Sequence, residues 1–158
     1  MSLRLDATDW RILKELQADG RITNVALAAR VGLSPPPCLR RVQALERAGF
    51  IRGYHAELDL ALSGFEIQAF AMVTLRAQGE AELREFENRL LTWPIVREAH
   101  MLAAEADYML KCVARDMAAF QDFVLAELGT FPNVASVKTS IVLRRAKHEP
   151  GVPLETRR

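Results

Sequence analysis

The stretch LSPPPCLRRVQALERAGF (residues 33–50) begins with three prolines in a row and continues with the periodicity of an amphipathic helix. The first N–H groups of a helix have no intrahelical acceptor, and proline already supplies the required φ, so prolines there cost no hydrogen bond. The stretch therefore predicts a helix with Ser34 as N-cap that runs to Ala48 and is ended by a left-handed Gly49.

At about 100° per residue, this helix has a buried and an exposed face. The residues predicted to face inward are Cys38, Leu39, Val42, Leu45 and Gly49. The residues predicted to face outward are Pro36, Arg40, Ala44 and Arg47, with Pro37 and Arg41 at the edges. Arginine can clamp guanine O6 and N7, and proline or alanine can touch a thymine methyl, so the outward face suits the DNA major groove. The alternative is a solvated face without a ligand.

Two more helices are predicted before residue 33. Asp6 as N-cap, with Asp9 three residues later, forms a variant of the capping box, and Gly20 can close this first helix. The second helix has Thr23 or Asn24 as its cap. Its predicted inward residues are Val25, Ala28 and Val31, and it ends at Gly32. Because only VGL separates the second helix from the proline-led one, the pair is predicted to be a helix-turn-helix, which disfavours the solvated-face alternative.

The second half of the chain has the pattern strand, helix, strand, strand, helix, strand. The predicted segments are strand 65–75, helix 80–93, strands 96–102 and 107–114, helix 116–128 and strand 134–143. The motif T-aromatic-P-x-V occurs at Thr92–Val96 and again at Thr130–Val134, each time where a helix gives way to a strand. Two matching halves of this kind indicate a ferredoxin-like βαββαβ sheet, so the predicted fold class is α+β.

These patterns predict two domains. Residues 1–62 form a winged-type helix-turn-helix domain whose end, residues 51–60, is a linker strand. Residues 63–148 form the ferredoxin-like domain, and residues 149–158 are a loose tail. The first segment carries nine Lys or Arg and seven Asp or Glu, whereas residues 63–142 carry seven and eleven. Residues 30–52 hold five arginines against one acid, which is a basic patch within a chain of net charge +1.

Composition narrows the functional classes. Half of the 158 residues are apolar, which favours a packed fold, and no apolar run approaches the ~20 residues of a membrane helix. No secretory signal is visible, and the two cysteines, Cys38 and Cys112, lie in apolar patterns, so we expect a cytoplasmic protein with free thiols. We expect no metal and no cofactor, and no membrane partner.

The sequence closely resembles the Lrp/AsnC family of bacterial and archaeal transcription regulators over residues 3–148. The likeness is carried by LDATDWRILKELQADGRIT (5–23), LAARVGLSPPPCLRRVQALERAGFIRGY (27–54), ADYMLKCVARDM (106–117) and FPNVASVKTSIVLRRAK (131–147). The resemblance implies a dimer that assembles further, to a tetramer or octamer, and commonly binds an amino acid between dimers.

Matching positions imply the functional residues. Contacts to double-stranded DNA are implied for Asn24, Ser34, Pro36, Pro37, Arg40 and Arg41, and the exposed face adds Arg47. An effector site is implied at Met101, Leu102, Ala104, Glu105, Asp107, Tyr108, Ser136 and Thr139. The family usually has glycine where this chain has Ala104, which restricts φ > 0 in that turn. For Asp107, a structural role as a turn carboxylate is an equal alternative.

The predicted function is therefore a sequence-specific transcriptional regulator, not an enzyme, that an amino-acid-type effector modulates through its oligomeric state. A dimer is predicted through the Phe70 and Met72 face of the sheet and its last strand. Two rivals stay open. One is a tetrapyrrole (sirohaem-type) decarboxylase of the same fold, with His55 and His100 as acid–base groups. The other is an amino-acid sensor or assembly module whose helix-turn-helix contacts only protein.

Overall fold

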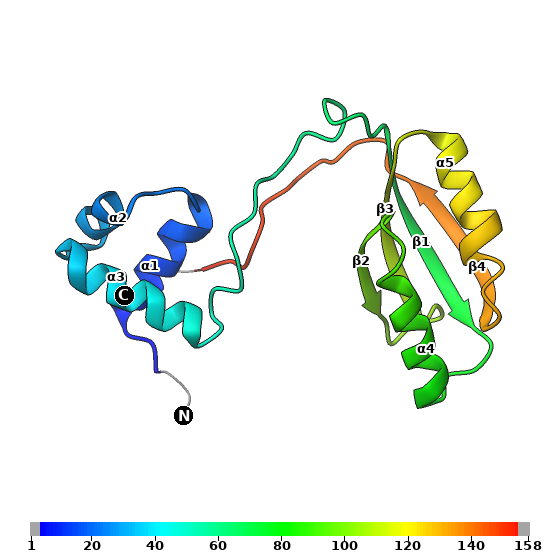
Figure 1. Cartoon of the computed structure of the whole chain (residues 1–158), viewed down its shortest axis with the longest axis horizontal. Helices are drawn as coiled ribbons and strands as arrows, with labels where there is room; N and C mark the ends of the chain where they lie inside the picture. Colours follow the sequence, from blue (N-terminus) through cyan, green and yellow to red (C-terminus); the bar gives the residue numbers. More distant parts are fainter. Residues whose placement is uncertain (1–3, 155–158) are drawn as a thin grey trace. The chain divides into compact units, whose positions relative to one another are not determined.

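The computed structural model describes residues 4–154, which divide into two compact units. One unit contains residues 4–57 and 147–154, and the other contains residues 58–146. Helices make up the first unit, and a four-stranded sheet with its helices makes up the second (Figure 1).

The first unit is built from α1 (Ala7–Ala18), α2 (Asn24–Val31) and α3 (Pro35–Arg47). Their buried side chains form one small core, made of Ile12, Leu27, Ala28, Val31, Cys38 and Leu45. Partly buried apolar residues of the turns, such as Leu33 and Ile51, pack against it. This core holds α2 and α3 together on either side of the turn at residues 32–34, as predicted for a helix-turn-helix.

Most of the predicted helix caps are confirmed. The Asp6 carboxylate accepts from the N–H groups of Thr8 and Asp9, while the Asp9 carboxylate accepts from the Asp6 N–H, which is the reciprocal capping box. Thr23 caps α2, and Gly32 is left-handed, with φ 74°. Gly49 is left-handed as well, with φ 78°. Gly20 is not, because α1 ends on an extended Asp19.

Three predictions of inward-facing residues were wrong. Val25, Leu39 and Gly49 are exposed, whereas Leu27 is buried. In α3 the fully buried positions are Cys38 and Leu45, seven residues apart, and only Arg41 and Val42 lie between them on the same side. The buried stripe is therefore rotated away from Leu39, towards Arg41.

The predicted linker strand was also wrong. Residues 51–59 contain no strand, and the alternating side chains Tyr54 and Leu58 are exposed. A strand needs a hydrogen-bonded neighbour, and alternation along the sequence cannot supply one.

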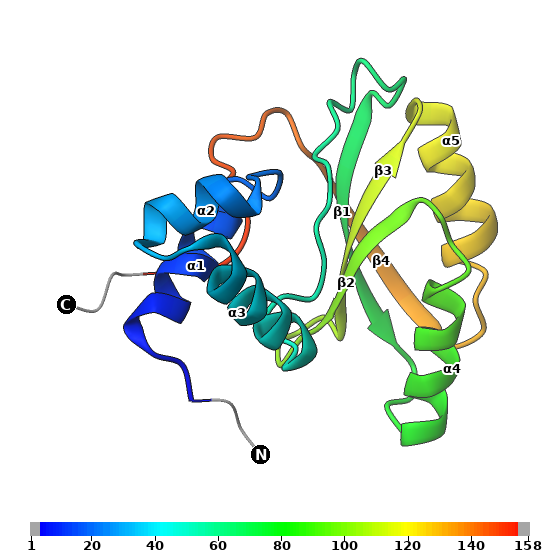
Figure 2. The ribbon, with the colours of Figure 1, turned by 60° about the vertical axis from the view of Figure 1, so that its left-hand side comes forward.

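The second unit is a split βαβ sheet. Its elements are β1 (Ile67–Leu75), α4 (Glu80–Leu90), β2 (Val96–Met101), β3 (Tyr108–Ala114), α5 (Met117–Asp122), the π-helical turn η1 (Phe123–Leu128) and β4 (Val134–Ile141). The strand order is β2-β3-β1-β4 with every neighbour antiparallel, which confirms the ferredoxin-like prediction. Helices α4 and α5 lie on the same face of the sheet (Figure 2).

The core of this unit lies between the sheet and its helices. On β1 the side chains alternate between the two faces of the sheet, with Ala69, Ala71, Val73 and Leu75 buried. Phe86 of α4 is at the centre of an aromatic group and packs edge-to-face on Trp93, Tyr108 and Phe131.

The repeated T-aromatic-P motif makes the same turn twice. The Thr92 hydroxyl donates to the Arg89 carbonyl, and the Thr130 hydroxyl donates to the Ala126 carbonyl. Both aromatic rings pack on Phe86, and each aromatic carbonyl accepts from the N–H three residues later, at 3.0 Å and 2.9 Å. The motif is thus a shared structural solution for leaving a helix and entering a strand.

The last helix departs from a regular period. A 3.6-residue period over residues 116–128 places Met117, Phe120, Val124 and Leu128 on one face, but Met117 is exposed and Phe123 is buried. From Phe123 on, the helix is the wider η1, in which the Gly129 N–H donates to the carbonyl of Val124, five residues earlier. A 3.6-residue period cannot locate such a wider turn.

Candidate nucleic-acid interface and ligand turn

The start of α3 has an unusual shortage of backbone donors. A serine N-cap normally accepts from the N–H of the second or third helical residue, and here those residues are Pro36 and Pro37. The Ser34 side chain consequently makes no cap hydrogen bond, and the first N–H in the helix is that of Cys38, which donates to the Ser34 carbonyl at 3.3 Å. An anion at this end would have to be bound by side chains, for which the exposed Ser34 hydroxyl is available.

Asn24 fixes the position of this helix start. Its Nδ2 donates to the Pro35 carbonyl at 2.8 Å, which ties the first residue of α2 to the first residue of α3. Its Oδ1 is buried and has no partner among the residues described. The structure thus gives the Asn24 side chain an internal role in holding the helix-turn-helix together.

Arg40 and Arg47 project from the exposed side of α3. Both are exposed, and neither has a hydrogen bond or ion pair with any residue from 4 to 154. Pro36 is exposed one turn before Arg40, whereas Pro37 and Ala44 are half-buried. Two guanidinium groups, one near the proline-led start of α3 and one at its last residue, thus keep all of their donors free for a ligand.

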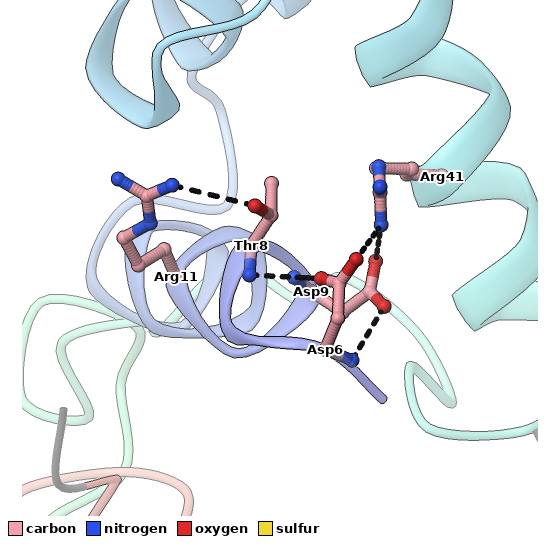
Figure 3. Close-up of polar contacts among 5 residues, drawn as sticks. All are labelled: Asp6, Thr8, Asp9, Arg11 and Arg41. Atoms are coloured by element: carbon pink, nitrogen blue, oxygen red, sulfur yellow. Dashed lines mark hydrogen bonds and ion pairs between the residues drawn. The ribbon is translucent and has the colours of Figure 1, made fainter. Parts of the chain in front are cut away.

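Arg41 behaves differently. Its Nη1 lies 2.8 Å from Asp6 Oδ2 and 2.7 Å from Asp9 Oδ1, so one guanidinium bridges both carboxylates of the capping box (Figure 3). The Asp9 side chain is only 11% exposed. The Asp9 N–H, and then Arg41, hold the pKa of Asp6 below its ordinary value, and the two carboxylates raise the pKa of Arg41.

Arg41, predicted at the edge of the exposed face, therefore has a partner within the chain. The side chain connects α3 to the N-terminus of α1. Helical spacing could have predicted this position of Arg41. Arg41 follows Cys38 by three residues and precedes Leu45 by four, and Cys38 and Leu45 are both buried. An arginine at such a position lies beside the core.

The turn that the resemblance assigned to an effector lies between β2 and β3, at residues 102–107. The Leu102 N–H closes it on the Asp107 carbonyl at 2.8 Å. The Asp107 carboxylate is buried and accepts from the Leu75 N–H and from Gln78 Nε2, each at 2.7 Å. Both carboxylate oxygens are therefore engaged within the chain, which favours the structural alternative for Asp107.

Tyr108 is likewise part of the fold. Its ring packs on Phe86, and its hydroxyl donates to Glu87 Oε1 at 2.9 Å. Burial, followed by the Glu87 carboxylate, raises the pKa of Tyr108 to about 12. The side chain points to the helix layer and not to solvent.

The other predicted effector residues lie on more than one surface. Glu105 forms an ion pair with Lys138 of β4 at 3.1 Å, so this turn lies beside that strand. Ser136 pairs across from Thr74 and Thr139 from Ala71, and their odd spacing places them on opposite faces of β4. Met101 is exposed. No residue other than glycine has a positive φ among those described, so Ala104 is accommodated without backbone strain.

Sequence reasoning missed Asn133. Its side-chain amide exchanges two hydrogen bonds with the backbone of Ala77, at 3.0 Å and 2.9 Å. Together with Asp107 it holds the loop that follows β1. A difference between the two T-aromatic-P motifs could have indicated this role, because the polar Asn133 occupies the position at which the first motif has the apolar Ile95.

Both units match known domains. Residues 5–52 match a winged helix-turn-helix DNA-binding domain, and residues 68–152 match the Lrp/AsnC ligand binding domain. The chain belongs to the Lrp/AsnC family. It is 53% identical over 145 residues to a leucine-responsive regulatory protein of Rhizobium meliloti, covering 92% of this chain and 93% of that one. It is 36% identical to the transcriptional regulator AzlB of Bacillus subtilis, covering 98% of this chain and 99% of that one.

Solved structures of Lrp/AsnC proteins agree with the fold. A transcriptional regulator from Neisseria meningitidis, solved as an L-Met complex, superposes with a TM-score of 0.91 at 42% identity, covering 96% of this chain and 97% of that one. An AsnC family regulator from Agrobacterium tumefaciens gives a TM-score of 0.88 at 29% identity, covering 95% and 97%. These comparisons confirm the predicted fold class and the family's function, transcription regulation by a DNA-binding and a ligand-binding domain.

Two negative findings accompany this assignment. Among residues 4–154, no cluster of His, Cys, Asp and Glu could hold a metal ion, and no helix is long and apolar enough to span a membrane. His100, one of the acid–base groups of the rival decarboxylase, is on β2 with its Nε2 3.6 Å from Glu98 Oε2. The members of the family are regulators, which favours regulation over that alternative.

Proposed function

We propose that this chain is a cytoplasmic, non-enzymatic regulator that recognises specific DNA sequences by placing α3 in the major groove. Arg40 contacts a base edge, and Arg47 and Ser34 contact the phosphate backbone. Pro36 and Pro37 form the apolar tip. The observation that carries this proposal is the contrast between neighbouring arginines, of which Arg41 is bound to Asp6 and Asp9 while Arg40 is free.

Asn24 and Arg41 are assigned a supporting role. They hold α3 at its first residue and at its seventh, against α2 and α1 respectively. A recognition helix fixed at two points loses little conformational freedom on binding, so more of its contact energy appears as affinity.

A dimer would present two such helices. The sheet face that carries Phe70 and Met72 is opposite to the buried Ala69 and Ala71, and neither α4 nor α5 of the same unit lies over it (Figure 2). We propose that a second copy covers this face and that dimers assemble further. Two α3 helices about 34 Å apart would then reach successive turns of the major groove and select imperfect palindromes.

Salt dependence tests DNA binding against the assembly-module alternative. If Arg47 contacts a phosphate, Arg47→Ala should lower the slope of log K against log[salt] by about 1. Arg84→Ala, on the exposed surface of α4, is the matched control and should leave the slope unchanged. Fluorescence anisotropy on a duplex from 50 to 200 mM salt measures both. Wild-type binding that does not respond to salt would contradict phosphate contacts.

The effector is proposed to be a free amino acid, with L-methionine as the first candidate because a similar regulator was solved with it. The proposed contacts are Met101 at the end of β2, Leu102, Ala104 and Glu105 of the 102–107 turn, and Ser136 of β4, with Thr139 reachable from the other face only. Asp107 and Tyr108 position this turn. An effector would act by binding one association state more tightly than another.

Light scattering with each of the twenty amino acids tests this proposal. We expect at least one to shift the mass distribution of the wild-type protein. Asp107→Ala should lose the response, because the carboxylate no longer ties the turn to Leu75 and Gln78. Glu85→Ala, on the exposed side of α4, should keep it. If no amino acid shifts the distribution, control by a free amino acid is wrong.

A further inference from the structure

The C-terminal segment docks on α1 through one side chain. Gln17 Nε2 donates to the Val152 carbonyl at 2.7 Å, and the Val152 N–H donates to Gln17 Oε1 at 3.0 Å. A single amide group therefore satisfies both backbone groups of one residue, as a neighbouring strand would. For the tail, which the sequence predicts to be loose from residue 149, these hydrogen bonds favour a docked segment up to residue 154, and residues 155–158 lie outside the described part.

Two neighbouring features support a specific contact. Gly151 has φ +90°, and a Cβ added there would lie 2.3 Å from Gln17 Oε1, so glycine is what allows the backbone to approach the amide. His148 Nε2 lies 3.1 Å from Glu57 Oε1, which adds a second contact within the same unit.

Docking of the tail changes how the chain connects its two units. Residues 147–154 belong to the same compact unit as residues 4–57, while residues 58–146 form the other. The chain therefore passes between the units twice, once before β1 and once after β4. A domain on one flexible linker samples a wide volume, whereas a second short connection removes most of that freedom.

We propose that the docked segment 147–154 is a second tether that limits the separation of the two α3 helices in a dimer and so selects the spacing of DNA half-sites. The role in half-site spacing rests on the proposed DNA binding. Docking of the tail is independent of DNA binding and can be measured without DNA.

The first experiment measures docking by limited trypsin cleavage of the full chain after Lys147. Gln17→Ala removes both hydrogen bonds, and Gly151→Ala blocks the approach. Each should raise the cleavage rate about tenfold, since proteolysis follows the population of the open form. Val152→Ala keeps the backbone groups and its side chain is largely exposed, so it should cleave like the wild type. Equal rates for all four proteins would overturn the docking.

The second experiment measures affinity for duplexes whose two half-sites are spaced normally or moved apart by half a helical turn. The wild type should prefer the normal spacing, and Gln17→Ala should lose about tenfold of that preference while binding a single half-site normally. A tail that opens without changing the preference would overturn the tether role and leave the docking intact. Wild-type protein that binds no duplex would remove the proposed function and the tether role together, while the trypsin result would still decide the docking.

Discussion

Arg40→Ala is expected to weaken binding to the operator by about 5- to 150-fold, which corresponds to roughly 1–3 kcal/mol for one bidentate base contact. The fold should not change, because the Arg40 side chain is exposed and makes no hydrogen bond or ion pair with any residue from 4 to 154. Anisotropy titration at fixed salt, together with urea unfolding of the same preparation, separates binding from stability.

Two variants sharpen this prediction. Arg40→Lys keeps the charge and loses the planar fork, so it should restore nonspecific affinity without restoring the preference for the operator. Arg47→Ala should weaken binding to all sequences about equally, as expected for a phosphate contact. Full operator affinity in Arg40→Ala would contradict the assignment of this arginine to a base.

Arg41→Ala is expected to destabilise the first unit by about 1–3 kcal/mol, because Asp9 would keep a mostly buried carboxylate without its cationic partner. The half-exposed Asp6 contributes less, since solvent screens its ion pair. Urea unfolding measures the loss. The matched control is Arg40→Ala, which changes the adjacent arginine and should leave the unfolding midpoint in place.

The stabilisation that ionised Asp6 gives to the folded protein decreases as the pH falls. The pKa of Asp6 is below its ordinary value of 3.8 in the folded protein, first through the Asp9 N–H and then through Arg41. The associated stabilisation is complete above pH 3.8 and is lost as the pH falls through the lower folded pKa. Wild-type protein should therefore lose stability below about pH 4. Arg41→Ala should lose less over the same range, and an equally steep loss would show that Arg41 contributes nothing to the shift.

Features set by nearby residues were predictable from the sequence. The capping box needs only Asp6 and Asp9, the left-handed turn needs Gly32, and the alternation on β1 follows from side chains two residues apart. The repeated T-aromatic-P motif located both helix exits. In each case the physical cause lies within a few residues of the feature.

Features that depend on contacts between residues far apart in the sequence were not predictable. Arg41 pairs with residues 32 and 35 positions away, Asp107 holds Leu75 and Gln78, and Gln17 holds a residue 135 positions along the chain. Residues 51–59 show the reverse case, in which an alternating pattern has no pairing strand. The candidate DNA interface was therefore predictable as a face of a helix, while the division between the arginine that anchors and the arginine that stays free required the structure.

The different roles of Arg40 and Arg41 are tested most directly by selecting bound duplexes from a random pool. The wild type, Arg40→Ala and Arg41→Ala are compared at a temperature at which all three are folded. The wild type should select an imperfect palindrome with half-sites one helical turn apart. Arg40→Ala should lose the preference at one position in each half-site, and Arg41→Ala should keep the complete motif. The account would be contradicted if Arg41→Ala lost a base preference while Arg40→Ala selected the wild-type motif.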